Sequence, residues 1–153
     1  MTRVFPIFCG LGYAFLIEAP QGLYLVDSCS PGQYSRVLEK MKQLGRADLK
    51  LIWITHAHYD HFGSAAALQA LTGASIGVHP ADAESLRAGR SPLGKPRRHG
   101  VLFPLVQPLV NLARRLPATP PDFTLEDGGS LEQFGLEARI LHTPGHTPGH
   151  TCL

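Results

Sequence analysis

The feature that most constrains this chain is a cluster of histidines directly after a short apolar run. Residues 51–54 are apolar, and His56, His58, Asp60 and His61 follow within a few positions. If the run forms a buried strand, the motif leaves the sheet edge, where residues i and i+2 of an extended chain point the same way. Two imidazoles can then converge on one ion while Asp60 and His61 approach from another side. Such ligands suit zinc.

A second histidine cluster follows another strand-like run, over residues 136–141. His142, His146 and His150 lie here among prolines and glycines, which fix loop conformations. Loops at strand ends commonly present ligand side chains. For His142 and His150, which flank the centre of this loop, we weigh plain loop structure against a supporting role or contact with a substrate.

With both clusters in this order, the sequence resembles the metallo-β-lactamase-fold hydrolases, which include the glyoxalase II-like thioesterases and the lactonases. The resemblance rests on His-x-His-x-Asp-His at 56–61 and Thr-Pro-Gly-His-Thr-Pro-Gly at 143–149. It implies that the two first histidines bind one zinc with the histidine of the later loop, and that the remaining pair binds a second metal. The implied metal ligands are His56, His58, Asp60, His61 and His146.

The resemblance implies a zinc-dependent hydrolase in which a metal-bound hydroxide attacks an ester, thioester, lactone or amide carbonyl of a small molecule. Zinc lowers the pKa of its bound water to about 7, which supplies that hydroxide at neutral pH. Asp60 is the expected catalytic residue, because its carboxylate orients the nucleophile and can accept its proton. A glutamate at position 58 would favour a di-iron redox relative, and histidine stands there instead.

Two alternatives to this enzyme stay open. One is an incomplete metal-binding fragment without catalytic activity. The other is a nuclease of the same superfamily, suggested only by a group of basic residues: Arg87, Arg90, Lys95, Arg97 and Arg98. The net charge of +2 is too small to indicate a nucleic-acid partner by itself.

The expected fold is α+β: an αββα sandwich of the metallo-β-lactamase type, incomplete at the C-terminus, in one domain over residues 1–153. Apolar runs predict strands over 4–9, 13–19, 23–27, 49–54 and 75–79, and helical patterns lie over 30–44 and 63–71. Residues 123–125 and 130–134 are expected to form a hairpin, followed by a strand over 136–141.

In the family the domain continues beyond the later histidine loop, with an aspartate that bridges the metals and a last histidine for the second metal. Neither has a counterpart here, so we expect one or two zinc ions with the second site incomplete. A half-built second sheet would expose apolar surface. A homodimer and completion by another chain are both open.

Residues 81–121 depart from the alternation of strands and helices. Residues 81–88 fit a helix, and residues 101–116 carry a wide apolar face with polar residues on one stripe. We expect this insert to form a lid or pocket wall over the metal site. A helix packed for stability or dimerisation is the alternative.

Three further positions carry smaller expectations. Asp27 matches the family position whose carboxylate orients the metal loop, against the alternative of a strand-end turn former. His79 is expected at a turn or pocket wall. Cys29, with Cys9 and Cys152, makes an odd count without motif spacing. We therefore expect reduced thiols in a cytoplasmic protein, with Cys29 packed and inert. The sequence shows neither a secretory signal nor the run of roughly 20 apolar residues that a membrane helix needs.

Overall fold

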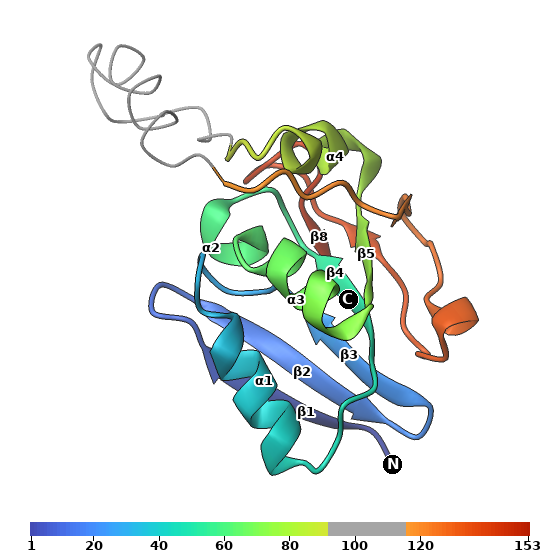
Figure 1. Ribbon diagram of the computed structural model, residues 1–153. Coiled ribbons are helices and arrows are strands. Elements are labelled where there is room, and N and C mark those ends of the chain that lie inside the picture. The colour runs from blue at the N-terminus through green and yellow to red at the C-terminus, as the bar shows by residue number, and fades with distance from the viewer. Residues whose placement is uncertain (92–115) are drawn as a thin grey trace.

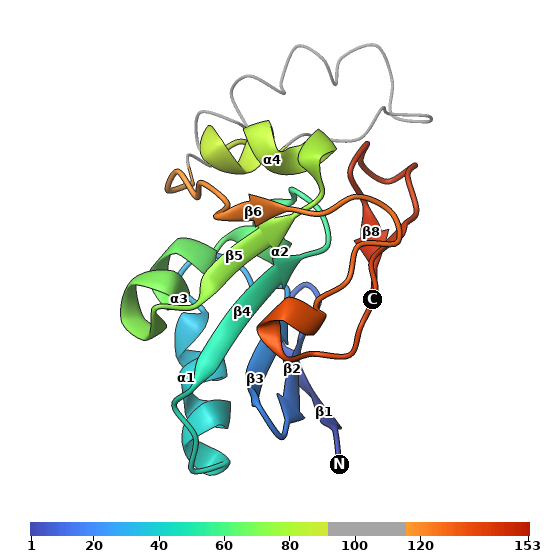
Figure 2. The ribbon, with the colours of Figure 1, turned by 90° about the vertical axis from the view of Figure 1, so that its right-hand side faces the viewer.

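The fold centres on a six-stranded sheet with strand order β1-β2-β3-β4-β5-β6 (Figures 1 and 2). The computed structural model describes residues 1–91 and 116–153. The strands are β1 (Arg3–Phe8), β2 (Tyr13–Ala19), β3 (Gly22–Val26), β4 (Leu49–Ile54), β5 (Ser75–Val78) and β6 (Phe123–Thr124). β1, β2 and β3 pair antiparallel, and the pairs from β3 to β6 are parallel. A second, two-stranded antiparallel sheet joins β7 (Leu141–His142) to β8 (Thr151–Cys152).

Helices cover one face of the large sheet. The helical segments are α1 (Tyr34–Gln43), α2 (Tyr59–Phe62), α3 (Ala65–Thr72), α4 (Pro80–Arg87) and the short 3-10 helix η1 (Glu132–Phe134). Figure 2 shows α1 and α3 on one side of the sheet and the segment from η1 to β8 on the other. None of the helices in the described ranges is long and apolar enough to cross a membrane.

The central strand β4 is buried on both faces. Ile52 and Ile54 belong to the core beneath the helices, whereas Leu51 and Trp53 belong to the core under residues 131–140. Alternation along a strand sends neighbouring side chains to opposite faces. A strand covered on both sides reads as a continuous apolar run, and each fully buried side chain of this kind contributes about 1.5–3 kcal/mol. This burial fixes the point at which the histidine motif leaves the sheet.

The predicted α+β alternation is confirmed, and one local prediction is wrong. The expected hairpin over 123–125 and 130–134 does not form: Phe123–Thr124 instead pairs with β5. Glycine at position 77 permits this pairing, because a Cβ there would lie 2.4 Å from the Phe123 ring. Ser130 makes a single bridge to Arg139, and the predicted strand over 136–141 is reduced to β7.

The prediction of reduced, inert thiols is wrong for Cys9 and Cys29, which form a disulfide. Their Cα atoms lie 5.1 Å apart because the end of β1 passes beside the turn after β3. Nothing in the spacing of the cysteines indicates this approach, since it depends on the tertiary arrangement of the strands. Cys152 is free and exposed.

The predicted insert is only partly described. The helix expected over residues 81–88 is confirmed as α4. The helix expected over 101–116 falls, except for Leu116, outside the described residues, as do Lys95, Arg97 and Arg98 of the basic group. The lid therefore stays a prediction.

Candidate metal centre

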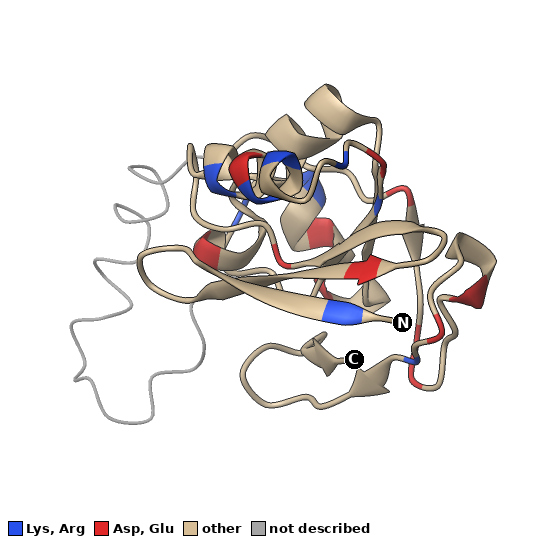
Figure 3. Ribbon diagram, turned by 90° about the horizontal axis from the view of Figure 1, so that it is seen from below, with Lys and Arg blue, Asp and Glu red and all other residues tan. Residues whose placement is uncertain are grey.

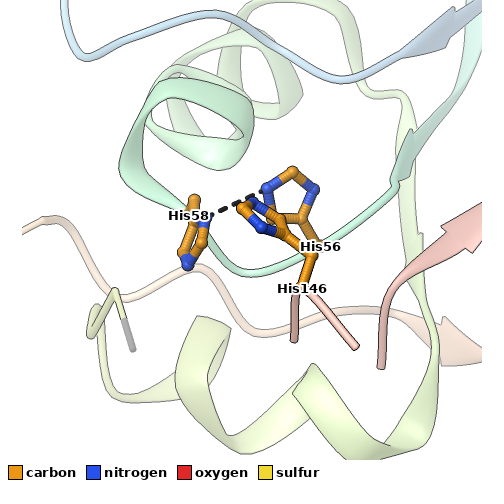
Figure 4. A group of neighbouring side chains, drawn as sticks. All are labelled: His56, His58 and His146. Carbon is orange, nitrogen blue, oxygen red and sulfur yellow. Dashed lines mark hydrogen bonds between the residues drawn. The ribbon is translucent and has the colours of Figure 1, made fainter. Parts of the chain in front are cut away.

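Three histidines from two distant segments converge beyond the end of β4. The potential ligand atoms of His56, His58 and His146 all lie within 4.8 Å of one another. Figure 4 shows the three rings gathered together, His56 and His58 from the loop after β4 and His146 from the loop between β7 and β8. The ring centroids of His58 and His146 are 4.6 Å apart. Within residues 1–91 and 116–153, these three residues form the group that could hold a metal ion.

The later loop reaches the first one because the C-terminal segment is fastened to the end of β4. The Thr151 amide donates to the Thr55 carbonyl at 2.9 Å. The indole N–H of Trp53 donates to Thr151 Oγ1 at 3.1 Å. These bonds join positions nearly a hundred residues apart, so they place β8 and the loop that precedes it beside the histidine motif.

Asp27 orients the motif from the end of β3, as expected from the resemblance. Its Oδ1 accepts the Thr55 amide at 2.9 Å, and its carboxylate also accepts the Thr55 hydroxyl. Because that hydroxyl proton is committed to Asp27, the 3.0 Å contact between Thr55 Oγ1 and His56 Nδ1 must be donated by His56. His56 then carries its proton on Nδ1, which leaves Nε2 as the ligand atom.

The electrostatics of the site favour a neutral His56. Burial, followed by the neighbouring imidazoles of His61 and His58, lowers the pKa of His56 to about 2. For His61, burial alone would lower the pKa. The hydrogen bond to Asp27 and the negative charges of Asp27 and Asp60 outweigh burial, so the pKa of His61 is raised above its ordinary value. A neutral imidazole is the form that binds metal.

Asp60 and His61 lie beside the three histidines, at α2, without joining their group. His61 donates from Nδ1 to Asp27 Oδ2 at 2.7 Å, and its Nε2 lies 3.6 Å from Asp60 Oδ2. The rings of His61 and His56 are 4.0 Å apart between centroids. Their role as ligands of a second metal, and Asp60 as the catalytic residue, stay predictions.

Three further histidines of the described residues, His79, His142 and His150, lie around this loop. His79 and His142 stack with parallel rings, 4.0 Å between centroids, and His142 Nε2 donates to the Pro148 carbonyl at 2.9 Å. His150 contacts Thr143 Oγ1 through Nδ1 at 2.8 Å, and its ring centroid lies 5.1 Å from that of His56. His79 therefore lies at the turn that begins α4, and His142 contacts both His79 and the loop that carries His146.

Sequence reasoning missed Asp82, Thr55 and Thr147. Asp82 is buried and accepts hydrogen bonds from both ligand loops. In the sequence it reads as an acidic residue in the first turn of a helix, which is an ordinary position for aspartate. Its place after the His79-Pro80 helix start gives no sign that two other segments pack against it. The threonines likewise read as loop residues.

Solved structures that are similar to this chain include metallo-β-lactamases. BJP-1, a subclass B3 metallo-beta-lactamase of Bradyrhizobium japonicum, is 26% identical, with a TM-score of 0.74 over 99% of this chain and 53% of that one. A B3 metallo-beta-lactamase with an active-site glutamic acid is 31% identical, with a TM-score of 0.73 over 97% of this chain and 52% of that one.

Curated relatives include hydroxyacylglutathione hydrolases. The enzyme of Albidiferax ferrireducens is 29% identical over 134 residues, which are 88% of this chain and 38% of that protein. The enzyme of Pseudomonas aeruginosa strain LESB58 is 34% identical over 95 residues, which are 62% of this chain and 24% of that protein. The chain thus spans about half of the similar structures and less of these curated relatives.

The α+β fold and the three-histidine group together are those of a metallo-β-lactamase-type domain. The family model of the metallo-beta-lactamase superfamily matches residues 7–153, and the chain belongs to that superfamily. Its central sheet and covering helices agree with the sandwich that the sequence predicts.

Proposed function

We propose that this chain carries the zinc-binding part of a hydrolase that acts on an ester, thioester, lactone or amide carbonyl of a small molecule. The observation that carries the proposal is the convergence of His56, His58 and His146 within 4.8 Å. Three histidines that leave a fourth position open are the ligand set of catalytic zinc. The fit is supported by His56, whose protonated Nδ1 leaves Nε2 available as the ligand atom.

When bound, zinc supplies a Lewis acid for a carbonyl oxygen and a water of lowered pKa. The chain's own groups supply orientation and proton transfer. Asp60, at the start of α2, accepts a hydrogen bond from the attacking water and takes its proton as the carbonyl carbon is attacked. Thr55 and Asp27 hold the His56 ring in one tautomer while this occurs. Asp60 and His61 alone would hold a second metal weakly, since they provide two ligands.

The substrate class follows from the relatives. They are named as hydroxyacylglutathione hydrolases and metallo-β-lactamases, so a hydroxyacylglutathione and a β-lactam are the two substrates with which to begin. The predicted insert over 81–121 would form part of the pocket wall, and its described helix α4 already lies beside the ligand loops through Asp82.

The proposal also includes a partner surface. The apolar face of β1 and β2, with Val4, Phe8 and Tyr13 about half exposed, would pack against further polypeptide, and a second copy of this chain is the first candidate. The sequence also predicts a cytoplasmic location, but we do not include it in the proposal, because disulfides such as Cys9–Cys29 are rare in the reducing cytosol. Thiol titration of protein freshly released from cells decides that point.

The first test is zinc content per folded chain, by elemental analysis after extensive dialysis. We expect about one zinc in the wild type and loss of that zinc in His146→Ala. Glu137→Ala is the control, since it removes an exposed potential ligand from the same C-terminal segment but outside the ligand group, and it should keep the metal. A folded wild type without zinc would contradict the proposal. Zinc-loaded protein that hydrolyses neither substrate would favour the non-catalytic fragment.

A further inference from the structure

The buried carboxylate of Asp82 lies between the two ligand loops. Asp82 is 1% exposed. Its Oδ2 accepts the Ala57 amide at 2.9 Å, from the residue between His56 and His58. The same oxygen accepts the Thr147 hydroxyl at 2.7 Å, next to His146.

The other carboxylate oxygen is also committed to the later loop. Asp82 Oδ1 accepts the Gly149 amide at 2.8 Å. This approach requires glycine, because a Cβ at position 149 would lie 2.7 Å from the Asp82 carboxyl carbon. Burial of an ionised carboxylate is costly unless hydrogen bonds compensate for it. Here the compensating donors all come from the two loops that carry the histidines.

We propose that Asp82 is a positioning residue that fastens the His56–His58 loop to the His146 loop and so sets the spacing of the three ligands. The consequence for metal binding rests on the proposed function. The connection between the two loops does not rest on the proposed function, because its three hydrogen bonds are present in the chain without a metal. Asp82 acts from a third element, α4, so it fixes both loops against one rigid body instead of tying them only to each other.

Three variants isolate this role. Asp82→Asn keeps the size of the side chain, but its amide nitrogen would face at least one of the three donors, and two donors cannot pair. Thr147→Val removes the hydroxyl donor, and Thr147→Ser restores it. Asp122→Asn is the matched control: Asp122 accepts the Ile76 amide and the Gln69 side chain, each at 2.7 Å, away from the ligand loops.

The first readout is amide hydrogen exchange in metal-free protein. For Asp82→Asn we expect exchange to rise about tenfold at residues 56–58 and at 146–150 together, as loss of a hydrogen bond to a charged group would give. Asp122→Asn should accelerate exchange at Ile76 and leave both loops unchanged. The proposal is overturned if only one loop responds, if neither does, or if both loops already exchange freely in the wild type.

The second readout is zinc affinity, with the visible spectrum of the cobalt-substituted protein as a report on ligand geometry. We expect the zinc Kd of Asp82→Asn to rise about 10- to 100-fold, as for other groups that orient metal ligands. Thr147→Val should show a smaller rise, and Thr147→Ser should restore the wild-type value and spectrum. A wild type that binds no zinc would end the proposed function, while hydrogen exchange would still decide the role of Asp82. Unchanged affinity and spectrum in Asp82→Asn would refute the positioning role.

Discussion

At the scale of single residues, the organisation of the site depends on carboxylates that accept several hydrogen bonds at once. Asp27 is one of them: it accepts from Thr55 and from His61, and it does so in a left-handed conformation with φ of 62°. Asparagine tolerates that conformation better than most residues, so Asp27→Asn removes the charge without new backbone strain. This makes the substitution a direct test of what the carboxylate contributes.

For Asp27→Asn we expect the free energy of unfolding of the metal-free chain to fall by about 2–3 kcal/mol, since hydrogen bonds to a buried charged group are lost. Denaturant titration measures this. Asp48→Asn is the control, because Asp48 pairs with Arg46 at the surface, where such pairs contribute little. Equal effects of the two substitutions would show that the Asp27 network does not stabilise the fold.

At the scale of elements, α4 begins at a titratable cap. His79 Nδ1 accepts the Ala81 amide at 3.2 Å. Burial, and then the facing charge of His142, lowers the pKa of His79, although Asp82, Glu126 and Asp127 oppose this shift. As pH falls below about 6.5, the unfolded chain binds a proton at His79 that the folded chain does not. The contribution of His79 to stability is therefore present above that pH and is lost as the pH falls through the lowered pKa.

His79→Asn should reduce the loss of folding stability at acid pH, because asparagine caps a helix but does not titrate. The measurement is the free energy of unfolding of the metal-free protein, followed downward from neutral pH. We expect the variant to lose less stability than the wild type over the same range. An identical slope would mean that His79 does not titrate differently in the folded and unfolded chain.

The elements that could be predicted from the sequence are those whose signal is local. The strand β4 and its histidine motif are local features, a continuous apolar run followed by alternating ligands, and both were predictable. The meeting of His146 with His56 was inferred only from the family resemblance, because the contacts that bring it about join distant segments. The wrong hairpin and the missed disulfide have the same origin, since Gly77 against Phe123 and Cys9 against Cys29 are tertiary approaches without a local signature.

At the scale of the whole molecule, one face of the large sheet is left open at its β1–β2 edge. The register pairs Phe8 with Tyr13 and Pro6 with Phe15, which puts their side chains on a common face. Phe8 and Phe15 are 51% and 41% exposed. In Figure 3 the two strands carry little charge, and their sequences contain only Arg3 and Glu18 as charged residues. Exposed apolar patches of this kind mark interaction surfaces.

The double variant Phe8→Thr and Phe15→Thr should reduce concentration-dependent self-association of the chain, measured by sedimentation velocity. Threonine keeps a high strand propensity, so the hairpin should survive while its apolar face is lost. Leu71→Thr is the control, because Leu71 is 60% exposed on α3, away from this face, and its replacement should leave association unchanged. If the wild type sediments as a monomer at every concentration, a second copy is excluded as the occupant of the face, and a different chain becomes the candidate that covers it.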